Sequence, residues 1–479
     1  MDINIESISK RKENVLQKLP EIQNKNERQR EIKLKPSKKN MLIAADIVRK
    51  YILKHKRKIY GGMAIDLSIK RKNKRKGIYT EDNFPDYDFY TPEPIKDLVN
   101  ISNLLFEAGF KDIQGKEAFH ANTYKIRVEN YENELADVSY VWSYLYHKIP
   151  TIRVNGLNFV HPDFQIMDLY RVITNPTTGW LKIEKAYKRS SLLEQYYILP
   201  KMKNFFKNEF DSANKFNLSK TIKKPIYITL LENTILNRFL QKRNDYIIIG
   251  DVAYNKLIQK SSVRQKNIRL LDPKSKKYRV LLMSFSKNYD NLIKDLVNFI
   301  KNDSEISKIK TVSIQKFHPF LELYNYSTQI IVNGYPVIRI YNTKICQPYQ
   351  KIDGLLIGSV HLQLLMYYAW SFRNLVSKKD ALNKNVYKFI IYNLDFAREH
   401  YYAKHKKLGI EKNPYQELQI ECMGNEINTP FQLMIERKKT RRDFFYFPKD
   451  PKKLKTPEDF AKWNFPNRSG NEDGESIEQ

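Results

Sequence analysis

The stretch Ile59-Tyr-Gly-Gly-Met-Ala-Ile-Asp66 decides the fold, together with Asp86-Tyr-Asp88 and Leu135-Ala-Asp-Val-Ser-Tyr-Val141 further along the chain. The apolar residues before the glycine pair predict a short strand, and the apolar spacing after it predicts a helix. Residues i and i+2 of a strand point to one face, so Asp86 and Asp88 are expected to lie side by side. We expect Asp137 on a neighbouring strand. The three motifs predict a small sheet with an acidic cluster beside a glycine turn.

Three carboxylates on adjacent strands are the ligands that nucleotidyl transfer requires, because two divalent cations about 3.5–4 Å apart must be bridged. We predict Asp86, Asp88 and Asp137 as the catalytic metal ligands. The structural alternative for Asp137 is a surface strand residue or a turn cap, but its neighbours are apolar, and a buried aspartate needs a partner cation. Gly61 and Gly62 let the backbone approach a triphosphate and aim helix N-terminal amides at it, so we predict them as ATP-binding residues.

The composition of the chain favours a polyanionic partner. Its 479 residues are enough for two or three domains, and 84 Lys and Arg stand against 53 Asp and Glu, a net charge of +31. Excess positive charge with 13% aromatic residues suits single-stranded nucleic acid. A lysine-rich proteome with AT-biased codons is an alternative source of the charge.

The two cysteines, Cys346 and Cys422, have no paired spacing. We therefore expect neither a disulfide nor a zinc site, and a reducing compartment. No segment reaches the ~18 apolar residues of a membrane span, and the charged N-terminus does not resemble a signal peptide. The expectation is a soluble intracellular protein with no membrane contact.

The second half of the chain repeats the first. Ile95-Lys-Asp-Leu-Val-Asn100 recurs letter for letter as Ile293-Lys-Asp-Leu-Val-Asn298, and a strand with a glycine turn recurs at Asp245–Asp251. Both hexapeptides follow a predicted strand, and repeated order of this kind is typical of internal duplication. We therefore expect two copies of one sheet-and-helix unit.

The second copy is expected to be inactive. The offset of 198 residues between the hexapeptides places Ser284 and Ser286 where the first copy has its Asp-x-Asp pair. Counted from the glycine turn, Asp251 takes the place of the second glycine, where it would repel a phosphate. No acid in 336–340 matches the third aspartate. A unit without these acids cannot hold two metals.

The whole pattern predicts an α+β protein divided along the chain. The predicted parts are a charged N-terminal arm, which is either solvated or a helix resting on another surface, a catalytic domain with a helical extension, a degenerate second domain, a basic and aromatic segment, and a disordered tail. Their expected boundaries are 1–40, 41–205, 225–400, 401–465 and 466–479.

Three basic groups are candidates for substrate contacts. Lys185 and Arg189 share a helical face that suits a triphosphate, with an exposed solvated face as the alternative. The run 70–76 suits RNA but equally suits a localisation signal or a solvated loop. The run 437–442 precedes Phe444–Phe447 and is typical of a single-strand platform, unless those aromatic residues are core. The predicted RNA-binding residues are Arg71, Lys72, Lys74, Arg75, Lys76, Arg437, Lys438, Lys439, Arg441 and Arg442. His161, beside Pro162, is expected to be a structural hydrogen-bonding residue.

Four segments together resemble the poly(A) polymerase catalytic subunits of large nucleocytoplasmic DNA viruses: Tyr60-Gly-Gly-Met-Ala-Ile-Asp66, Pro85-Asp-Tyr-Asp-Phe89, Ala136-Asp-Val-Ser-Tyr140 and His161-Pro-Asp-Phe-Gln165. The resemblance is to the giant-virus and African swine fever virus type and, more distantly, to the poxvirus enzyme. It is tight over roughly residues 40–200 and looser beyond. It implies a polymerase-beta-like nucleotidyltransferase domain, followed by a degenerate second nucleotidyltransferase-like domain and helical extensions.

The resemblance also implies an activity, the template-independent addition of AMP from ATP to an mRNA 3′ end with two Mg²⁺ or Mn²⁺ ions. It carries over to the three aspartates as metal ligands and to Gly61 and Gly62 as the phosphate turn. A serine is usual at the position of Gly62 in the wider superfamily, so backbone amides or a basic side chain must replace its contact. The implied partners are a single-stranded RNA 3′ end and ATP, with a homodimer or a processivity partner left open. The implied location is the host cytoplasm, in viral factories, and the virion.

Two other functions stay open at this point. A nucleotidyltransferase acting on a tRNA end or a small molecule would use the same motifs, although a small-substrate enzyme does not need a net charge of +31. The second is a non-catalytic RNA-binding subunit with a relic fold. The intact triad of the first copy, beside its loss in the second, argues against that alternative.

Overall fold

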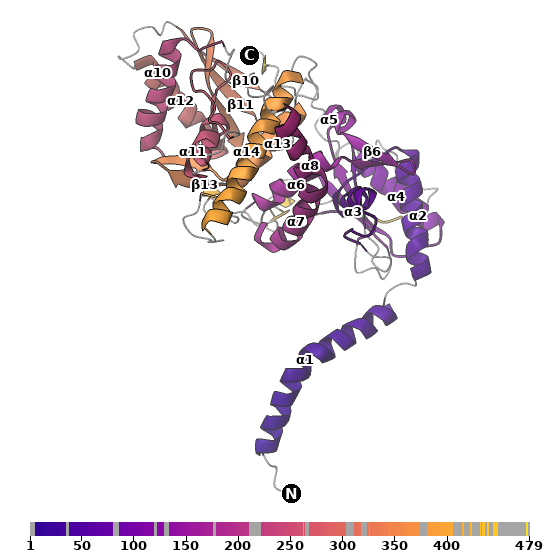
Figure 1. The fold of residues 1–479 in the computed structure, drawn as a ribbon. Helices are drawn as coiled ribbons and strands as arrows, with labels where there is room; N and C mark the ends of the chain where they lie inside the picture. Colours follow the sequence, from indigo (N-terminus) through magenta and orange to yellow (C-terminus); the bar gives the residue numbers. More distant parts are fainter. Residues whose placement is uncertain are drawn as a thin grey trace.

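The computed structural model describes residues 5–34, 38–79, 86–118, 122–128, 134–175, 179–209, 222–261, 263, 268–302, 311–317, 323–324, 326–343, 345–373, 381–405, 414–415, 422–423, 432, 434–435, 438–439, 444–448 and 476–477. Figure 1 shows two lobes, each built around a sheet, which meet across a layer of helices. The predicted α+β class is confirmed. No helix in these described parts is long and apolar enough to cross a membrane.

The first lobe is a mixed sheet whose strands lie in the order β16-β3-β4-β5-β2-β1-β7-β6. Side chains alternate along β4: Tyr124 and Ile126 are buried, whereas Thr123, Lys125 and Arg127 are partly exposed. This pattern is expected for a strand with one covered face. The strands are β1 (Lys58–Ile59), β2 (Tyr87–Thr91), β3 (Gln114–Glu117), β4 (Thr123–Arg127), β5 (Ala136–Tyr140), β6 (Thr151–Val154), β7 (Leu157–Val160) and β16 (Phe445–Tyr446).

Three helices, α2 (Lys38–Lys54), α3 (Gly61–Lys72) and α4 (Pro94–Glu107), pack against this sheet. Helix α4 begins with a proline in its first turn, where the missing N–H has no intrahelical partner to lose. Leu98, Ile101 and Leu105 recur at helical spacing and are fully buried, so one face of α4 covers the sheet.

The first lobe continues into the layer of helices where the two lobes meet. These are α5 (Ser143–Lys148), α6 (Pro162–Ile173), α7 (Gly179–Leu193), α8 (Leu199–Asn204), and the π-helical turns η1 (Glu194–Ile198) and η2 (Phe205–Glu209). The structural role predicted for His161 is confirmed, because it caps α6: its Nδ1 accepts a hydrogen bond from the backbone N–H of Asp163 at 3.2 Å.

The second lobe repeats the strand order of the first. Its sheet runs β15-β13-β14-β8-β9-β12-β11-β10-β17, so β10-β11-β12-β9-β8-β14-β13 corresponds strand for strand to β3-β4-β5-β2-β1-β7-β6. The pairing directions also agree, since β9 is parallel to β12 as β2 is to β5. The strands are β8 (Ile247–Ile249), β9 (Val280–Phe285), β10 (Val312–Phe317), β11 (Ser327–Val332), β12 (Tyr335–Thr343), β13 (Gln347–Ile352), β14 (Leu355–Gly358), β15 (Cys422–Met423) and β17 (Ser476–Ile477). The predicted duplication is confirmed.

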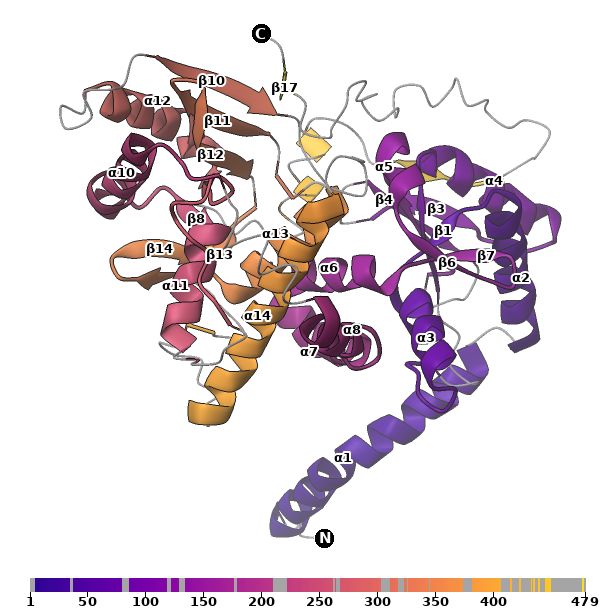
Figure 2. The ribbon, with the colours of Figure 1, turned by 45° about the horizontal axis from the view of Figure 1, so that its top comes forward.

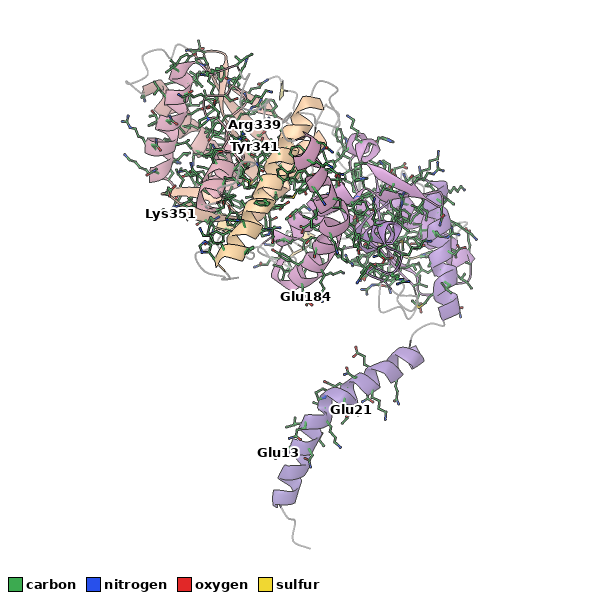
Figure 3. The ribbon with its side chains drawn as sticks, viewed as in Figure 1. Glu13, Glu21, Glu184, Arg339, Tyr341 and Lys351 are labelled. Carbon is green, nitrogen blue, oxygen red and sulfur yellow. A yellow bond between two sulfur atoms is a disulfide. The ribbon has the colours of Figure 1, made fainter. Side chains whose placement is uncertain are left out.

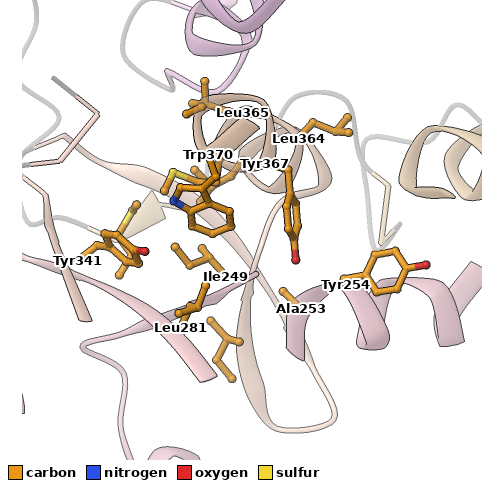
Figure 4. Packing of buried hydrophobic residues seen from close by; sticks show 14 of the residues in the cluster. Ile249, Ala253, Tyr254, Leu281, Tyr341, Leu364, Leu365, Tyr367 and Trp370 are labelled. Carbon is orange, nitrogen blue, oxygen red and sulfur yellow. The ribbon is translucent and has the colours of Figure 1, made fainter. Parts of the chain in front are cut away.

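The helices of the second lobe correspond to helices of the first and complete the layer of helices between the lobes. Just as α6 follows β7, α13 follows β14, and α6 and α13 pack against each other (Figure 2). The helices are α10 (Ile226–Thr234), the turns η3 (Ile235–Phe239) and η4 (Leu240–Lys242), α11 (Asp251–Ser261), α12 (Ser286–Asn302), α13 (Val360–Arg373) and α14 (Ala381–His405). Helix α13 is buried; its Tyr367 and Trp370 pack edge to face, and Trp370 lies over Ile249 and Leu281 in the core shown in Figure 4.

The register predicted for the second copy from the hexapeptides is wrong. Gly61 and Gly250 are the corresponding turns, with φ of 70° and 72°, a conformation that favours glycine. Counted from them along the strand pairs, Arg279 and Leu281, not Ser284 and Ser286, take the places of the Asp-x-Asp pair.

The identical hexapeptides give the wrong register because they begin at different positions along their helices. The first begins one residue after the start of α4 at Pro94, whereas the second begins seven residues after the start of α12 at Ser286. Their identity therefore marks the same kind of helix but not the same position along it.

The cysteines contradict another prediction. Cys346 and Cys422 form a disulfide, with their Cα atoms 5.4 Å apart. The pairing of β13 with β15 sets Gln347 opposite Met423, which brings the adjacent cysteines together across 76 residues of sequence. This long separation explains why spacing alone did not reveal the bond.

Helix α1 (Ile5–Leu34) stands away from both lobes in Figure 1. Its side chains are exposed over 13–27, and Figure 3 shows Glu13 and Glu21 pointing to solvent. The N-terminal segment is therefore helical over Ile5–Leu34, and its side chains over residues 13–27 face solvent.

Candidate functional site

Asp88 and Asp137 lie directly opposite each other. They are paired residues of the parallel strands β2 and β5, and Asp86 immediately precedes β2. The turn at Gly61 holds Asp88 from the other side, since the backbone N–H of Tyr60 donates to the carbonyl of Asp88 at 2.8 Å. A Cβ built on Gly61 would overlap the carboxylate of Asp88 and lie 3.0 Å from its Cγ. The close approach of Asp88 to the turn therefore requires a glycine at position 61.

The three aspartates repel one another. Burial raises the pKa of Asp88 well above its usual value, Asp86 and Asp137 raise it further, and the charges of Arg189 and Lys185 lower it. Burial also raises the pKa of Asp137 to about 6, against the lowering effect of Lys125 and with a further rise from Asp86. These mutual effects show that all three acids share one electrostatic environment, which favours a bound cation.

The donor set fits hard divalent cations. The Oδ1 atom of Asp137 is buried and has no hydrogen-bond partner among the described residues, which leaves a carboxylate oxygen for a ligand. Its Oδ2 lies 3.7 Å from Nζ of Lys125. Within the described residues no three acidic, histidine or cysteine side chains stand at metal-ligand spacing, so the ligand roles of the aspartates stay a prediction.

Basic side chains from α7 reach the acidic cluster. Arg189 is partly buried and Lys185 exposed, and both act on the charge of Asp88, while α7 packs against α3. The sequence reasoning missed Lys182, whose pKa is lowered by burial and by Lys185, and which interacts with Asp137. Its position three residues before Lys185 was the available signal, since i and i+3 share a helical face.

Tyr79 was also missed. Its phenol accepts a hydrogen bond from Nη2 of Arg189 at 3.3 Å, and its pKa is raised by burial and by Asp86 and Asp88. No sequence motif marks Tyr79, because only the fold of the loop after α3 brings it to the acidic cluster.

The predicted RNA-binding residues are only partly described. Arg71 and Lys72 end α3, and Lys74, Arg75 and Lys76 follow; all five are exposed. Lys438 and Lys439 are exposed as well, whereas Arg437, Arg441 and Arg442 lie outside the described residues.

The aromatic residues after the second basic cluster divide between core and surface. Phe444 is buried in the first lobe, and Tyr446 donates to Oδ1 of Asn103 at 2.5 Å. Phe445 and Phe447 point outward. Half of the expected stacking platform is therefore taken up by packing.

The corresponding place in the second lobe carries no acid. Arg339 stands opposite Leu281, as Asp137 stands opposite Asp88. Its guanidinium donates to Oγ of Ser327 at 2.8 and 2.9 Å and lies 3.9 Å from the ring centre of Phe317; Figure 3 labels it beside Tyr341. The prediction that the second copy lacks the acidic triad is confirmed.

Comparisons with known proteins agree over most of the chain. Residues 46–179 match the family "Poly(A) polymerase catalytic subunit", and residues 197–477 match "APMV, Putative poly(A) polymerase, catalytic subunit, C-terminal". The "Putative poly(A) polymerase catalytic subunit" of Acanthamoeba polyphaga mimivirus is 28% identical, over 95% of this chain and 81% of the relative. The African swine fever virus protein of the same name is 27% identical, over 64% of this chain and 55% of the relative.

One solved structure has the same fold. The crystal structure of the Megavirus polyadenylate synthase is similar with a TM-score of 0.77, over 100% of this chain and 93% of that one, at 24% identity. The two-lobed arrangement described above is thus an established architecture.

Replacing Asp137 by Asn is expected to raise the thermal stability of the protein in the absence of divalent cations. A carboxyl whose pKa rises from 3.8 to about 6 on folding destabilises the folded state once it ionises. The effect is on the order of 2–3 kcal/mol, since one pKa unit is about 1.4 kcal/mol.

The stabilisation expected from Asp137→Asn depends on pH, because it requires the carboxyl of Asp137 to be ionised. The difference in melting temperature between variant and wild type should be full above pH 6, shrink through the interval between the two pKa values, and vanish near the unfolded value of 3.8. Added Mg²⁺ should stabilise the wild type more than the variant. A variant less stable than the wild type at pH 8 without metal would contradict the assignment.

Proposed function

This chain belongs to the family of poly(A) polymerase catalytic subunits, and we propose that its three aspartates direct the transfer of AMP from ATP to an RNA 3′ end with two divalent cations. The observation that carries this proposal is the opposition of Asp88 and Asp137 over the Gly61 turn. Hard carboxylate oxygens suit Mg²⁺ or Mn²⁺.

Each acidic residue has a role in this proposal. Asp86, Asp88 and Asp137 would hold the cations, which, when bound, lower the pKa of the attacking 3′-hydroxyl and neutralise the departing pyrophosphate. Asp137 is also suited by position to accept the proton of that hydroxyl, because it is the acid on the strand opposite Asp88.

The triphosphate would lie over the N-terminus of α3. The first N–H groups of a helix have no intrahelical partner, and the helix dipole favours an anion there. Gly61 and Gly62 supply this end of α3, and Lys185 and Arg189 bring positive charge from α7. These four residues form the proposed ATP site.

A tailing assay tests the function. An RNA with an oligo(A) 3′ end should be extended with labelled ATP and Mg²⁺, much less with CTP, GTP or UTP, and small acceptors should not be labelled. Equal labelling of small acceptors would favour the other nucleotidyltransferase, and the absence of any incorporation would favour a non-catalytic subunit.

Replacing Lys74, Arg75 and Lys76 by alanine is expected to weaken binding of single-stranded RNA and to flatten its salt dependence. Each lost phosphate contact should reduce the log–log slope by about 0.7, because fewer counterions are released. Fluorescence anisotropy over a salt series measures both quantities.

The matched control replaces Lys287, Lys294 and Lys301 by alanine. These lysines are solvent-exposed on α12 of the second lobe. Their replacement removes the same three positive charges. Equal losses in the two triple variants would show that RNA binding depends on net charge alone and not on the loop after α3.

A second subunit is the finer part of the proposal. Helix α1 exposes Val15, Leu16, Leu19 and Ile22, which supports a contact with another copy of the chain or with a processivity partner. Sedimentation velocity of the full chain and of a chain beginning at residue 38 tests the first option, since the shorter chain should be monomeric. An unchanged dimer would exclude α1 as the contact.

A further inference from the structure

The loop after α3 is fastened back onto that helix by two of its side chains. Oδ1 of Asp66 accepts the backbone N–H groups of Ile78 and Tyr79 at 2.6 and 3.0 Å. Nζ of Lys70 donates to the carbonyl of Tyr79 at 2.8 Å and pairs with Asp66 at 2.8 Å. Asp66 and Lys70 are one turn apart, so together they hold both backbone polar groups of Tyr79. We name this pair the clasp.

A glycine closes the clasp. A Cβ built on Gly77 would lie 2.6 Å from both Oδ1 of Asp66 and Cε of Lys70. Any other residue would displace the side chains of Asp66 and Lys70 or the loop itself. The path of the chain through this point is therefore specified by sequence.

The clasp places the hydroxyl of Tyr79 over Gly62. A Cβ built on Gly62 would overlap this oxygen, and it would lie 3.0 Å from Cζ of Tyr79 and 2.8 Å from Nη2 of Arg189. The phenol and the guanidinium also contact each other, with Arg189 donating to Tyr79 at 3.3 Å. Two polar groups from different elements thus converge on the backbone at the N-terminus of α3.

The hydroxyl of Tyr79 is kept as a proton donor. Burial raises the pKa of Tyr79, and the nearby Asp86, Asp88 and Asp66 raise it further, against Arg189. A protonated phenol can accept from Arg189 and donate its own hydrogen to an anion.

We propose that the Tyr79 hydroxyl donates a hydrogen bond to a phosphate oxygen of bound ATP, beside Arg189, and that Asp66 and Lys70 are positioning residues that aim it. This inference rests on the proposed function and adds a residue and a supporting device to its ATP site. Gly62 is then a glycine because the hydroxyl and the guanidinium occupy the space that its side chain would take.

The direct test is calorimetric binding of Mg²⁺–ATP without RNA. Tyr79→Phe should weaken binding roughly 10- to 100-fold, the range for one hydrogen bond to a charged group. Inorganic tripolyphosphate should lose affinity by the same factor, since the contact is to phosphate. Tyr196→Phe is the matched control, because Tyr196 contacts Asn73 of the same loop and not Gly62. The affinity of the Tyr196→Phe variant for Mg²⁺–ATP should equal that of the wild type.

A double-mutant cycle tests the positioning role. Asp66→Ala should weaken ATP binding as Tyr79→Phe does, and the double variant should lose little more than either single variant. In tailing assays both should raise KM for ATP while keeping kcat within a few-fold. Melting temperatures show whether each variant is folded.

The outcomes separate this inference from the proposed function. Wild-type protein that binds neither Mg²⁺–ATP nor tripolyphosphate would overturn the proposed function. Wild-type protein that binds both, with Tyr79→Phe indistinguishable from it, would overturn only the inference. A loss for ATP without a loss for tripolyphosphate would also overturn it, because the hydroxyl would then contact the base or sugar.

Discussion

Replacing Asp88 by Asn is expected to reduce AMP incorporation by at least about a thousandfold while the protein stays folded. The carboxylate of Asp88 lies between the Gly61 turn and Asp137, where it would hold the divalent cations. Such cations supply several kcal/mol of transition-state stabilisation, and each ~1.4 kcal/mol is a factor of ten in rate. Primer extension under single-turnover conditions measures the loss.

Asp168→Asn is the control for Asp88→Asn. Asp168 is also a partly buried acid of the first lobe, but it accepts a hydrogen bond from Tyr90 at 2.6 Å and is not part of the triad. Asparagine keeps that acceptor, so tailing should change by no more than a few-fold. An Asp88→Asn protein that is folded and extends RNA at the wild-type rate would remove the basis of the site.

Replacing Gly61 by Ala is expected to lower both stability and tailing. The backbone conformation with φ of 70° costs a residue with a Cβ roughly 1–2 kcal/mol. The new methyl group would also push the carboxylate of Asp88 aside, and a displacement of ~1 Å at a reacting centre can cost about a hundredfold in rate. Melting curves and tailing rates below the melting temperature separate the two effects.

The internal duplication supplies the matched control, Gly250→Ala. Gly250 has φ of 72°, and its Cβ would lie 2.6 Å from Cδ1 of Leu281, which replaces the aspartate. This variant should lose similar stability but keep its tailing rate. An equal loss of tailing in the two variants, measured where both are folded, would mean that Gly61 acts through stability alone.

Local order made much of the fold predictable from sequence. The strand before the glycine pair, the helix after it and the strand that carries Asp88 follow from local sequence patterns, and the structure has each of them. The parallel pairing that sets Asp88 opposite Asp137 also agrees with the expectation that adjacent strands carry the acids. Short-range periodicity is enough for these elements, because each buries one face against a nearby neighbour.

Contacts between distant segments were beyond the reach of sequence patterns. The bond between Cys346 and Cys422 depends on β15 joining the edge of the second sheet. Phe444 completes the core of the first lobe from the far end of the chain. Neither contact has a local signal, because each depends on the path of the intervening chain.

The repeated hexapeptide shows a different limit. Identity of sequence fixed neither the helical turn at which Ile95 and Ile293 stand nor the residues that replace the aspartates. Only the paired strands and the positive φ of the glycine turns identify Arg279, Leu281 and Arg339 as the replacements. Backbone geometry is the more reliable marker of correspondence in a duplicated fold.

The central claim is that acids from β2 and β5 gather two divalent cations beside the Gly61 turn. Anomalous diffraction from crystals grown with Mn²⁺ and a non-hydrolysable ATP analogue tests this claim most directly. We expect two manganese peaks about 3.5–4 Å apart, bounded by Asp86, Asp88 and Asp137, with the triphosphate over the turn. Manganese bound elsewhere, or a nucleotide bound without metal at these aspartates, would contradict the account.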